Sequence, residues 1–144
     1  MAIMITCYGG INEIGGCKIL VEDGDVRVFL DFGKSFGRYS DYFDGVFVRE
    51  RTTRGLLDAM ALGLIPPIVL SHAHLDHSGD LDFVRPEVPV FSSRMTAFIA
   101  KAMQDSGKPG ASGVVYANPH TVKENGLLAA DKSKGYVWRQ WGFL

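Results

Sequence analysis

Short apolar runs separated by turn residues open the chain. Residues 3–7 and 17–22 are runs of strand-forming residues on either side of the glycine-rich segment GGINEIGG. The sequence Asp23-Gly24-Asp25 then predicts a hairpin turn into a third strand over residues 26–31. Apolar residues occupy both alternating faces of this third strand, which predicts a strand covered on both sides. The chain is therefore predicted to begin as a β-meander whose last strand ends at Asp31.

Helix and strand patterns alternate after the meander. Residues 54–63 predict a short helix, and residues 68–70 predict a buried strand after two prolines. A strand over residues 88–91 precedes an amphipathic helix that begins at a serine cap. The apolar stripe of that helix is expected to face the core and consists of Met95, Phe98, Ile99, Ala102 and Met103. Further strands are expected within residues 114–118 and 136–144, so the pattern predicts an α/β fold.

The composition is that of one globular domain. The chain has 144 residues, of which 47% are hydrophobic and 22% charged, so it needs neither a disulfide nor a structural metal merely to fold. Fifteen Lys and Arg against sixteen Asp and Glu give a net charge of −1. This balance excludes an overall basic field, so a nucleic-acid substrate would need a local basic patch.

The sequence also bears on the compartment. The longest apolar stretch, residues 56–70, is interrupted by a charge and two prolines, so no transmembrane helix is expected. The N-terminus lacks the basic and apolar regions of a secretory signal, and we expect a cytoplasmic protein. Only two cysteines, Cys7 and Cys17, are present. We interpret them as small buried side chains rather than as redox or metal-binding groups.

The strongest chemical signal is a histidine cluster directly after the predicted strand at residues 68–70. His72, His74 and His77 lie in the sequence HAHLDH together with Asp76. In an extended segment alternate residues project to one side, so positions 72, 74 and 76 are expected to converge, with His77 on a different side. Imidazoles and a carboxylate suit zinc and similar metals. A polar surface loop is the simpler alternative, but clustered polar groups beside a core need a compensating partner.

Two segments resemble a known family. SHAHLDHSG resembles the signature of the metallo-β-lactamase superfamily. The opening GGINEIGGCKILVE, followed by VFLDFG, resembles the β-CASP branch of RNA- and DNA-processing nucleases, in particular ribonuclease J-like exonucleases. The resemblance implies an αββα sandwich with a one- or two-metal hydrolytic site. Residues 1–144 are expected to form the first, N-terminal half of that α/β metallo-β-lactamase domain.

The resemblance also implies residue roles. It implies that His72 and His74 hold one metal ion and that Asp76 and His77 hold a second. Zinc is the implied cofactor, with two ions in the complete site, and Asp76 would bind metal and orient the attacking hydroxide as the catalytic residue. Asp31 is implied to orient the metal-binding loop, although an aspartate in Asp-Phe-Gly is by itself more typical of a turn.

The resemblance is incomplete. Its members add a later histidine, a bridging aspartate, a final histidine and an inserted β-CASP domain, which we expect to be absent from residues 1–144. His120 follows the motif too closely to replace them, and its context predicts a solvent-exposed or turn role rather than metal ligation. We therefore expect little turnover from this chain alone.

The implied activity is hydrolysis of phosphodiesters in RNA, or in single-stranded DNA, with no membrane partner; assembly into a homo-oligomer stays open. The alternatives are a small-molecule hydrolase of thioesters, lactones or lactams, and a non-catalytic metal-binding fragment.

Overall fold

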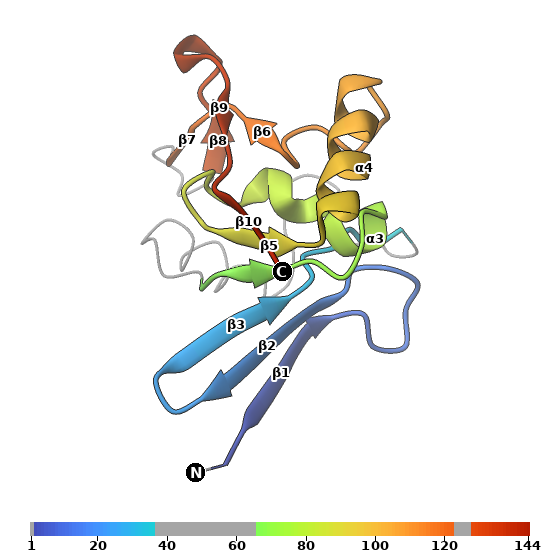
Figure 1. The fold of residues 1–144 in the computed structure, drawn as a ribbon, viewed down its shortest axis with the longest axis vertical. Helices are drawn as coiled ribbons and strands as arrows, with labels where there is room; N and C mark the ends of the chain where they lie inside the picture. The colour runs from blue at the N-terminus through green and yellow to red at the C-terminus, as the bar shows by residue number, and fades with distance from the viewer. Residues whose placement is uncertain (1, 37–65, 123–127) are drawn as a thin grey trace.

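A mixed sheet of six strands forms the centre of the fold (Figure 1). The computed structural model describes residues 2–36, 66–122 and 128–144, so the helix predicted over residues 54–63 lies outside the described part. The strands in spatial order are β1 (Met4–Gly9), β2 (Lys18–Asp23), β3 (Val26–Leu30), β4 (Ile68–Val69), β5 (Val90–Ser92) and β10 (Trp141–Phe143). The first three are antiparallel, as the predicted meander requires, whereas β3, β4, β5 and β10 run parallel.

Helices and two small sheets complete the described part of the chain. The helical elements are α3 (Leu75–Ser78), η1 (Gly79–Phe83), α4 (Arg94–Asp105) and η2 (Lys132–Lys134). The small sheets pair β6 (Tyr116–Ala117) with β9 (Val137–Trp138), and β7 (His120–Val122) with β8 (Leu128–Ala130). The α/β class is confirmed. In the described residues no helix combines the length and apolar character needed to cross a membrane.

Two predictions about the C-terminal region are corrected. The backbone of His120 begins strand β7 rather than a turn. Residues 136–144 form two short strands in different sheets rather than one strand. The divided C-terminal segment is anchored by Arg139, which is 5% exposed and donates hydrogen bonds to the carbonyl oxygens of Gly113, Arg85 and Leu81. Burial lowers the pKa of Arg139 to about 10, so the guanidinium stays charged at neutral pH.

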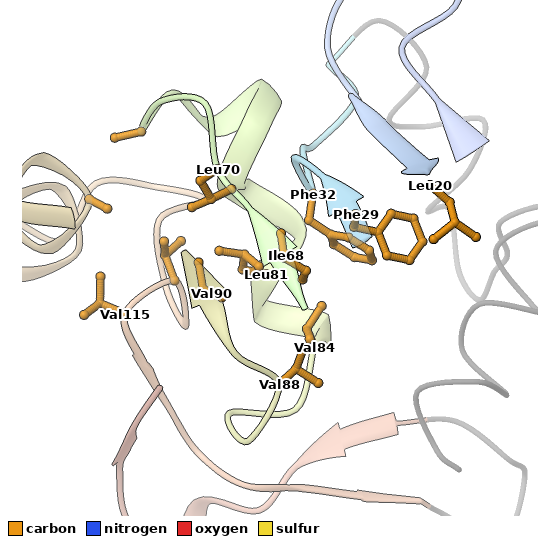
Figure 2. Close-up of a cluster of buried hydrophobic side chains, with 13 residues drawn as sticks. Leu20, Phe29, Phe32, Ile68, Leu70, Leu81, Val84, Val88, Val90 and Val115 are labelled. Atoms are coloured by element: carbon orange, nitrogen blue, oxygen red, sulfur yellow. The ribbon is translucent and has the colours of Figure 1, made fainter. Parts of the chain in front are cut away.

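The hydrophobic core lies against one face of the sheet (Figure 2). Leu20, Phe29, Ile68 and Val90 are paired in register across β2, β3, β4 and β5, and each is at most 3% exposed. Leu81 in η1 is also fully buried in this cluster. Full burial of one such side chain contributes roughly 1.5–3 kcal/mol. The core therefore fixes the ends of β3 and β4, where the polar residues follow.

The prediction that β3 is covered on both sides is wrong. Phe29 is 2% exposed, but Leu30 and Val26, whose side chains alternate with it, are 39% and 70% exposed. Apolar residues on both faces of a strand do not require that both faces are covered. The sequence pattern alone does not show which face packs against the core.

The prediction that the apolar stripe of α4 faces the core is wrong for all of its members except Met103, which packs against the core. Met95 and Phe98 are 65% and 70% exposed, whereas Thr96 and Ala100 are the buried residues of the helix. Small side chains on the packed face let the helix lie close to the core, and periodicity identifies a stripe without showing what it faces. The serine cap is confirmed, since Oγ of Ser93 accepts a hydrogen bond from the amide of Thr96 at 3.1 Å.

Candidate metal centre

The site begins where β3 and β4 end side by side. Asp31 directly follows β3, and its amide donates to the carbonyl of Val69 in β4 at 2.9 Å. Because the two strands are parallel, the residues that follow both of them meet at the same edge of the sheet. Asp31 has φ +60°, in the left-handed region that aspartate tolerates better than most residues. This backbone conformation occurs at the residue that faces the histidine turn, which we define as residues 71–78.

The carboxylate of Asp31 is the buried anchor of the histidine turn. It is 6% exposed and accepts hydrogen bonds from the amide of Ser71 at 2.8 Å and from the hydroxyl of Ser71 at 2.9 Å. It also contacts Nδ1 of His77 at 2.8 Å. The hydroxyl of Ser71 lies 2.9 Å from Nδ1 of His72 as well. With Nδ1 of both rings engaged, Nε2 of each ring is available to a metal.

Asp76 and His77 come from a helical turn, not from an extended segment. Helix α3 begins directly after His74, whose carbonyl accepts hydrogen bonds from the amides of His77 and Ser78, both at 2.9 Å. The side chain of Ser78 also donates to this carbonyl. The expected convergence of positions 72, 74 and 76, with His77 on a different side, is therefore corrected: the backbone turns into a helix after the second histidine, and His77 takes the place of His74 beside His72 and Asp76.

The turn brings three ligand groups together. Ligand atoms of His72, Asp76 and His77 all lie within 4.8 Å of one another. Nε2 of His77 is 3.4 Å from a carboxylate oxygen of Asp76, and the ring centroids of His72 and His77 are 4.0 Å apart. His74 is exposed and lies outside this group, with its ring 4.8 Å from that of His72. Burial, followed by the neighbouring rings of His77 and His74, lowers the pKa of His72, which keeps this imidazole neutral and able to bind a metal.

Main-chain hydrogen bonds hold the turn in place. The amide of Cys17 donates to the carbonyl of Asp76 at 3.1 Å, and the amide of Phe32 donates to that of His77 at 2.7 Å. The amide of Gly33 donates to Cys17 at 2.8 Å, and that of residue 34 to Leu75 at 2.8 Å. We call these four bonds the main-chain network. A Cβ at Gly33 would lie 1.6 Å from the carbonyl oxygen of Asp76, so only glycine fits there.

A buried ion pair lies beside the network. The ammonium of Lys18 is 2.7 Å from a carboxylate oxygen of Asp80, which is 2% exposed, and it also donates to the carbonyl of Gly33. The amide of Asp80 in turn donates to the carbonyl of Phe32 at 3.1 Å. The pair therefore supports residues 32 and 33 from the side of the core, and nothing in the sequence pattern identifies it.

Comparison with known proteins shows two kinds of relative. Transcription termination factor FttA of Thermococcus kodakarensis is 36% identical over 88 residues, which cover 57% of this chain and 12% of that protein. Ribonuclease J of Mycobacterium tuberculosis is 32% identical over 108 residues, which cover 72% of this chain and 18% of that protein. The chain is a relative of ribonuclease J and FttA. It spans less than a fifth of the length of either.

Comparison with solved structures and with family models adds less evidence about the family. A solved structure, the metallo-β-lactamase fold protein YhfI from Bacillus subtilis, is similar with a TM-score of 0.41 and 18% identity, over 70% of this chain and 42% of that one. No family model matches the chain. The sequence relationship to ribonuclease J and FttA confirms the family resemblance.

The prediction that both cysteines are buried is wrong. Cys7 is exposed, and Cys17 is only partly buried. In this relative of ribonuclease J, ligand atoms of Cys17, Asp31 and His77 all lie within 4.8 Å of one another. Burial, and after it the charge of Asp31, raises the pKa of the Cys17 thiol. The sequence places Cys17 far from the histidines, and only the pairing of β2 beside β3 brings it to the site.

Proposed function

We propose that this chain carries a zinc centre that hydrolyses phosphodiester bonds in RNA. The observation that supports the proposal most directly is the convergence of His72, Asp76 and His77. Three protein ligands leave one position of a tetrahedral zinc open, which is the arrangement of catalytic rather than structural zinc sites. RNA is supported as the substrate because one relative carries the name of a ribonuclease and the other that of a transcription termination factor.

Each residue of the centre has a distinct task in this proposal. Zinc, when bound, supplies a Lewis acid and lowers the pKa of a water molecule toward neutrality. His72 and His77 provide neutral nitrogens, and Asp76 provides a carboxylate that binds metal and accepts a hydrogen bond from the attacking water. Asp31 is a positioning residue, because its contact with Nδ1 of His77 fixes the orientation of that ring.

A second zinc ion is the finer part of the proposal. His74 is exposed and its ring lies against that of His72, so its nitrogens are accessible from solvent. We propose that His72 and His74 serve one ion and that Asp76 and His77 serve the other when two are bound. Two neighbouring metals stabilise the attacking and leaving oxygens of a phosphodiester together.

Zinc content tests the ligand assignment. The double variant His72→Ala, His74→Ala is expected to lose stoichiometric zinc, because isolated imidazoles bind zinc weakly. His120→Ala is the control, since the sequence predicts no metal role for that histidine. Elemental analysis that finds as much zinc in the double variant as in the control would contradict the assignment.

A comparison of two substrates tests the proposed reaction. The zinc-loaded chain is assayed in excess over labelled single-stranded RNA, and separately with a neutral thioester, at several salt concentrations. We expect slow RNA cleavage that weakens as salt is added, through counterion release, and that Asp76→Asn reduces about 100-fold or more.

Two results would contradict the proposed reaction. Thioester turnover without RNA cleavage would assign the site to small molecules. Stoichiometric zinc without turnover of either substrate would make this chain a metal-binding fragment.

A further inference from the structure

Cys17 lies on the side of His77 that faces Asp31. The thiol, the Asp31 carboxylate and a ring nitrogen of His77 form a group whose ligand atoms all lie within 4.8 Å of one another. Asp31 is buried, and the other two side chains are partly buried. This group is different from the one formed by His72, Asp76 and His77, and the two share only His77.

The position of Cys17 is fixed by its backbone. Its amide donates to Asp76 and its carbonyl accepts from Gly33, so both of its main-chain groups belong to the main-chain network. The preceding Gly16 donates to the carbonyl of residue 34 at 2.9 Å. A cysteine held at both of its polar main-chain atoms does not move independently of the histidine turn, so only rotation of its side chain changes the position of the thiol relative to His77.

The three groups are a metal-ligand set. Thiolate sulfur, imidazole nitrogen and carboxylate oxygen are the three donor types that zinc accepts, and sulfur adds a preference for soft cations. Asp31 retains the capacity to bind a cation, because a carboxylate has about four lone-pair sites and three groups contact it: the amide of Ser71, the hydroxyl of Ser71, which reaches both oxygens with one proton, and Nδ1 of His77.

We propose that Cys17 is a metal ligand and that Cys17, Asp31 and His77 form a thiolate-containing site for a soft divalent cation such as zinc or cadmium. On binding, the thiol proton is released to solvent and the sulfur donates an electron pair to the cation. The inference rests on the proposed function, because this site is a neighbour of the zinc centre and shares His77 with it. The sulfur ligand makes this site selective for zinc and cadmium over magnesium and manganese, which prefer oxygen ligands.

Ultraviolet absorption tests the proposal on the intact chain. Cadmium is titrated into the reduced protein, with a phosphine rather than a thiol as the reductant, and thiolate-to-metal charge-transfer absorption is recorded. The wild type and Cys7→Ser are expected to show the same band at one equivalent of cadmium, and Cys17→Ser is expected to lose it. Cys7 is the matched control because it is the other cysteine and is exposed. A band that survives in Cys17→Ser, or that disappears in Cys7→Ser, would overturn the assignment.

Cadmium NMR of the wild-type protein gives a result that depends on no variant. A resonance in the range of sulfur-ligated cadmium is expected, and one in the range of purely nitrogen- and oxygen-ligated cadmium would refute the proposal even if Cys17→Ser failed to fold.

The experiments distinguish failure of this proposal from failure of the proposed function. Zinc-dependent RNA cleavage with no thiolate band refutes the role of Cys17 alone, whereas a thiolate band without any RNA cleavage refutes the proposed reaction alone.

Discussion

Substitution of Gly33 by alanine should displace the histidine turn while leaving the sheet in place. The new Cβ would lie 1.6 Å from the carbonyl oxygen of Asp76 and 2.7 Å from the amide nitrogen of His77. Both contacts are with backbone, so no side-chain rotation relieves them, and the chain must separate by roughly 2 Å to reach an ordinary contact distance. That separation breaks the main-chain bonds from Cys17 to Asp76 and from Phe32 to His77.

The size of the effect follows from these bonds. At about 1 kcal/mol for each main-chain hydrogen bond, the loss of two or three lowers the free energy of unfolding by roughly 2–3 kcal/mol. Zinc affinity should fall by about 10- to 100-fold, the usual cost of disturbing groups that orient metal ligands.

Denaturant unfolding of the metal-free protein and zinc titration against a competing chelator measure the two effects of Gly33→Ala. The control is Gly107→Ala, because Gly107 has φ +70° and a Cβ added there would meet nothing within 4 Å, so only backbone strain of about 1–2 kcal/mol is expected. Zinc affinity should be unchanged in the control. If Gly33→Ala bound zinc as tightly as Gly107→Ala, the main-chain network would not be what holds the ligands, and the reasoning would be refuted.

Three further substitutions test other contacts. Asp31→Asn keeps the shape of the side chain but removes the charge that orients His77, so calorimetric titration should show zinc affinity reduced by about 10- to 100-fold. Lys18→Met leaves the carboxylate of Asp80 buried and unpaired, and urea unfolding should show a loss of about 3–5 kcal/mol. The more exposed pair of Arg27 with Glu22 provides its control, since Arg27→Met should cost about 1 kcal/mol or less. Arg139→Met removes the donors to three carbonyls, and thermal unfolding should show a loss of about 3 kcal/mol; an unchanged midpoint would contradict the anchoring role.

The sequence predicts the local elements around the site well. The alternation of apolar residues and the Asp-Gly turn predict the three-stranded meander, and the structure ends β3 one residue before Asp31. The density of histidines after a short apolar strand likewise predicts a polar cluster at the end of β4. Both signals are local, because each depends on residues within one strand and its following turn.

The sequence predicts less where distant segments meet. The participation of Cys17 depends on β2 pairing with β3, and the ion pair of Lys18 with Asp80 joins residues 62 positions apart. The one-turn helix α3 is not predictable from the sequence, because a turn beginning at Leu75 carries too few residues for a helical period to be visible. The exposed stripe of α4 shows the same limit, because periodicity does not determine which neighbour a face contacts.

The main-chain network holds the backbone of the histidine turn without using the ligand side chains. All four of its hydrogen bonds join backbone amides to backbone carbonyls, and none uses a side chain of positions 72, 74, 76 or 77. The backbone can therefore act as a template on which the side chains of positions 72, 74 and 76 can be exchanged, whereas His77 is also needed for the contact with Asp31. Replacing histidines by carboxylates at these positions would shift the preferred cation toward manganese or magnesium while the backbone path stayed the same. Single substitutions of these ligand side chains could therefore change the metal preference of the site in an engineered protein.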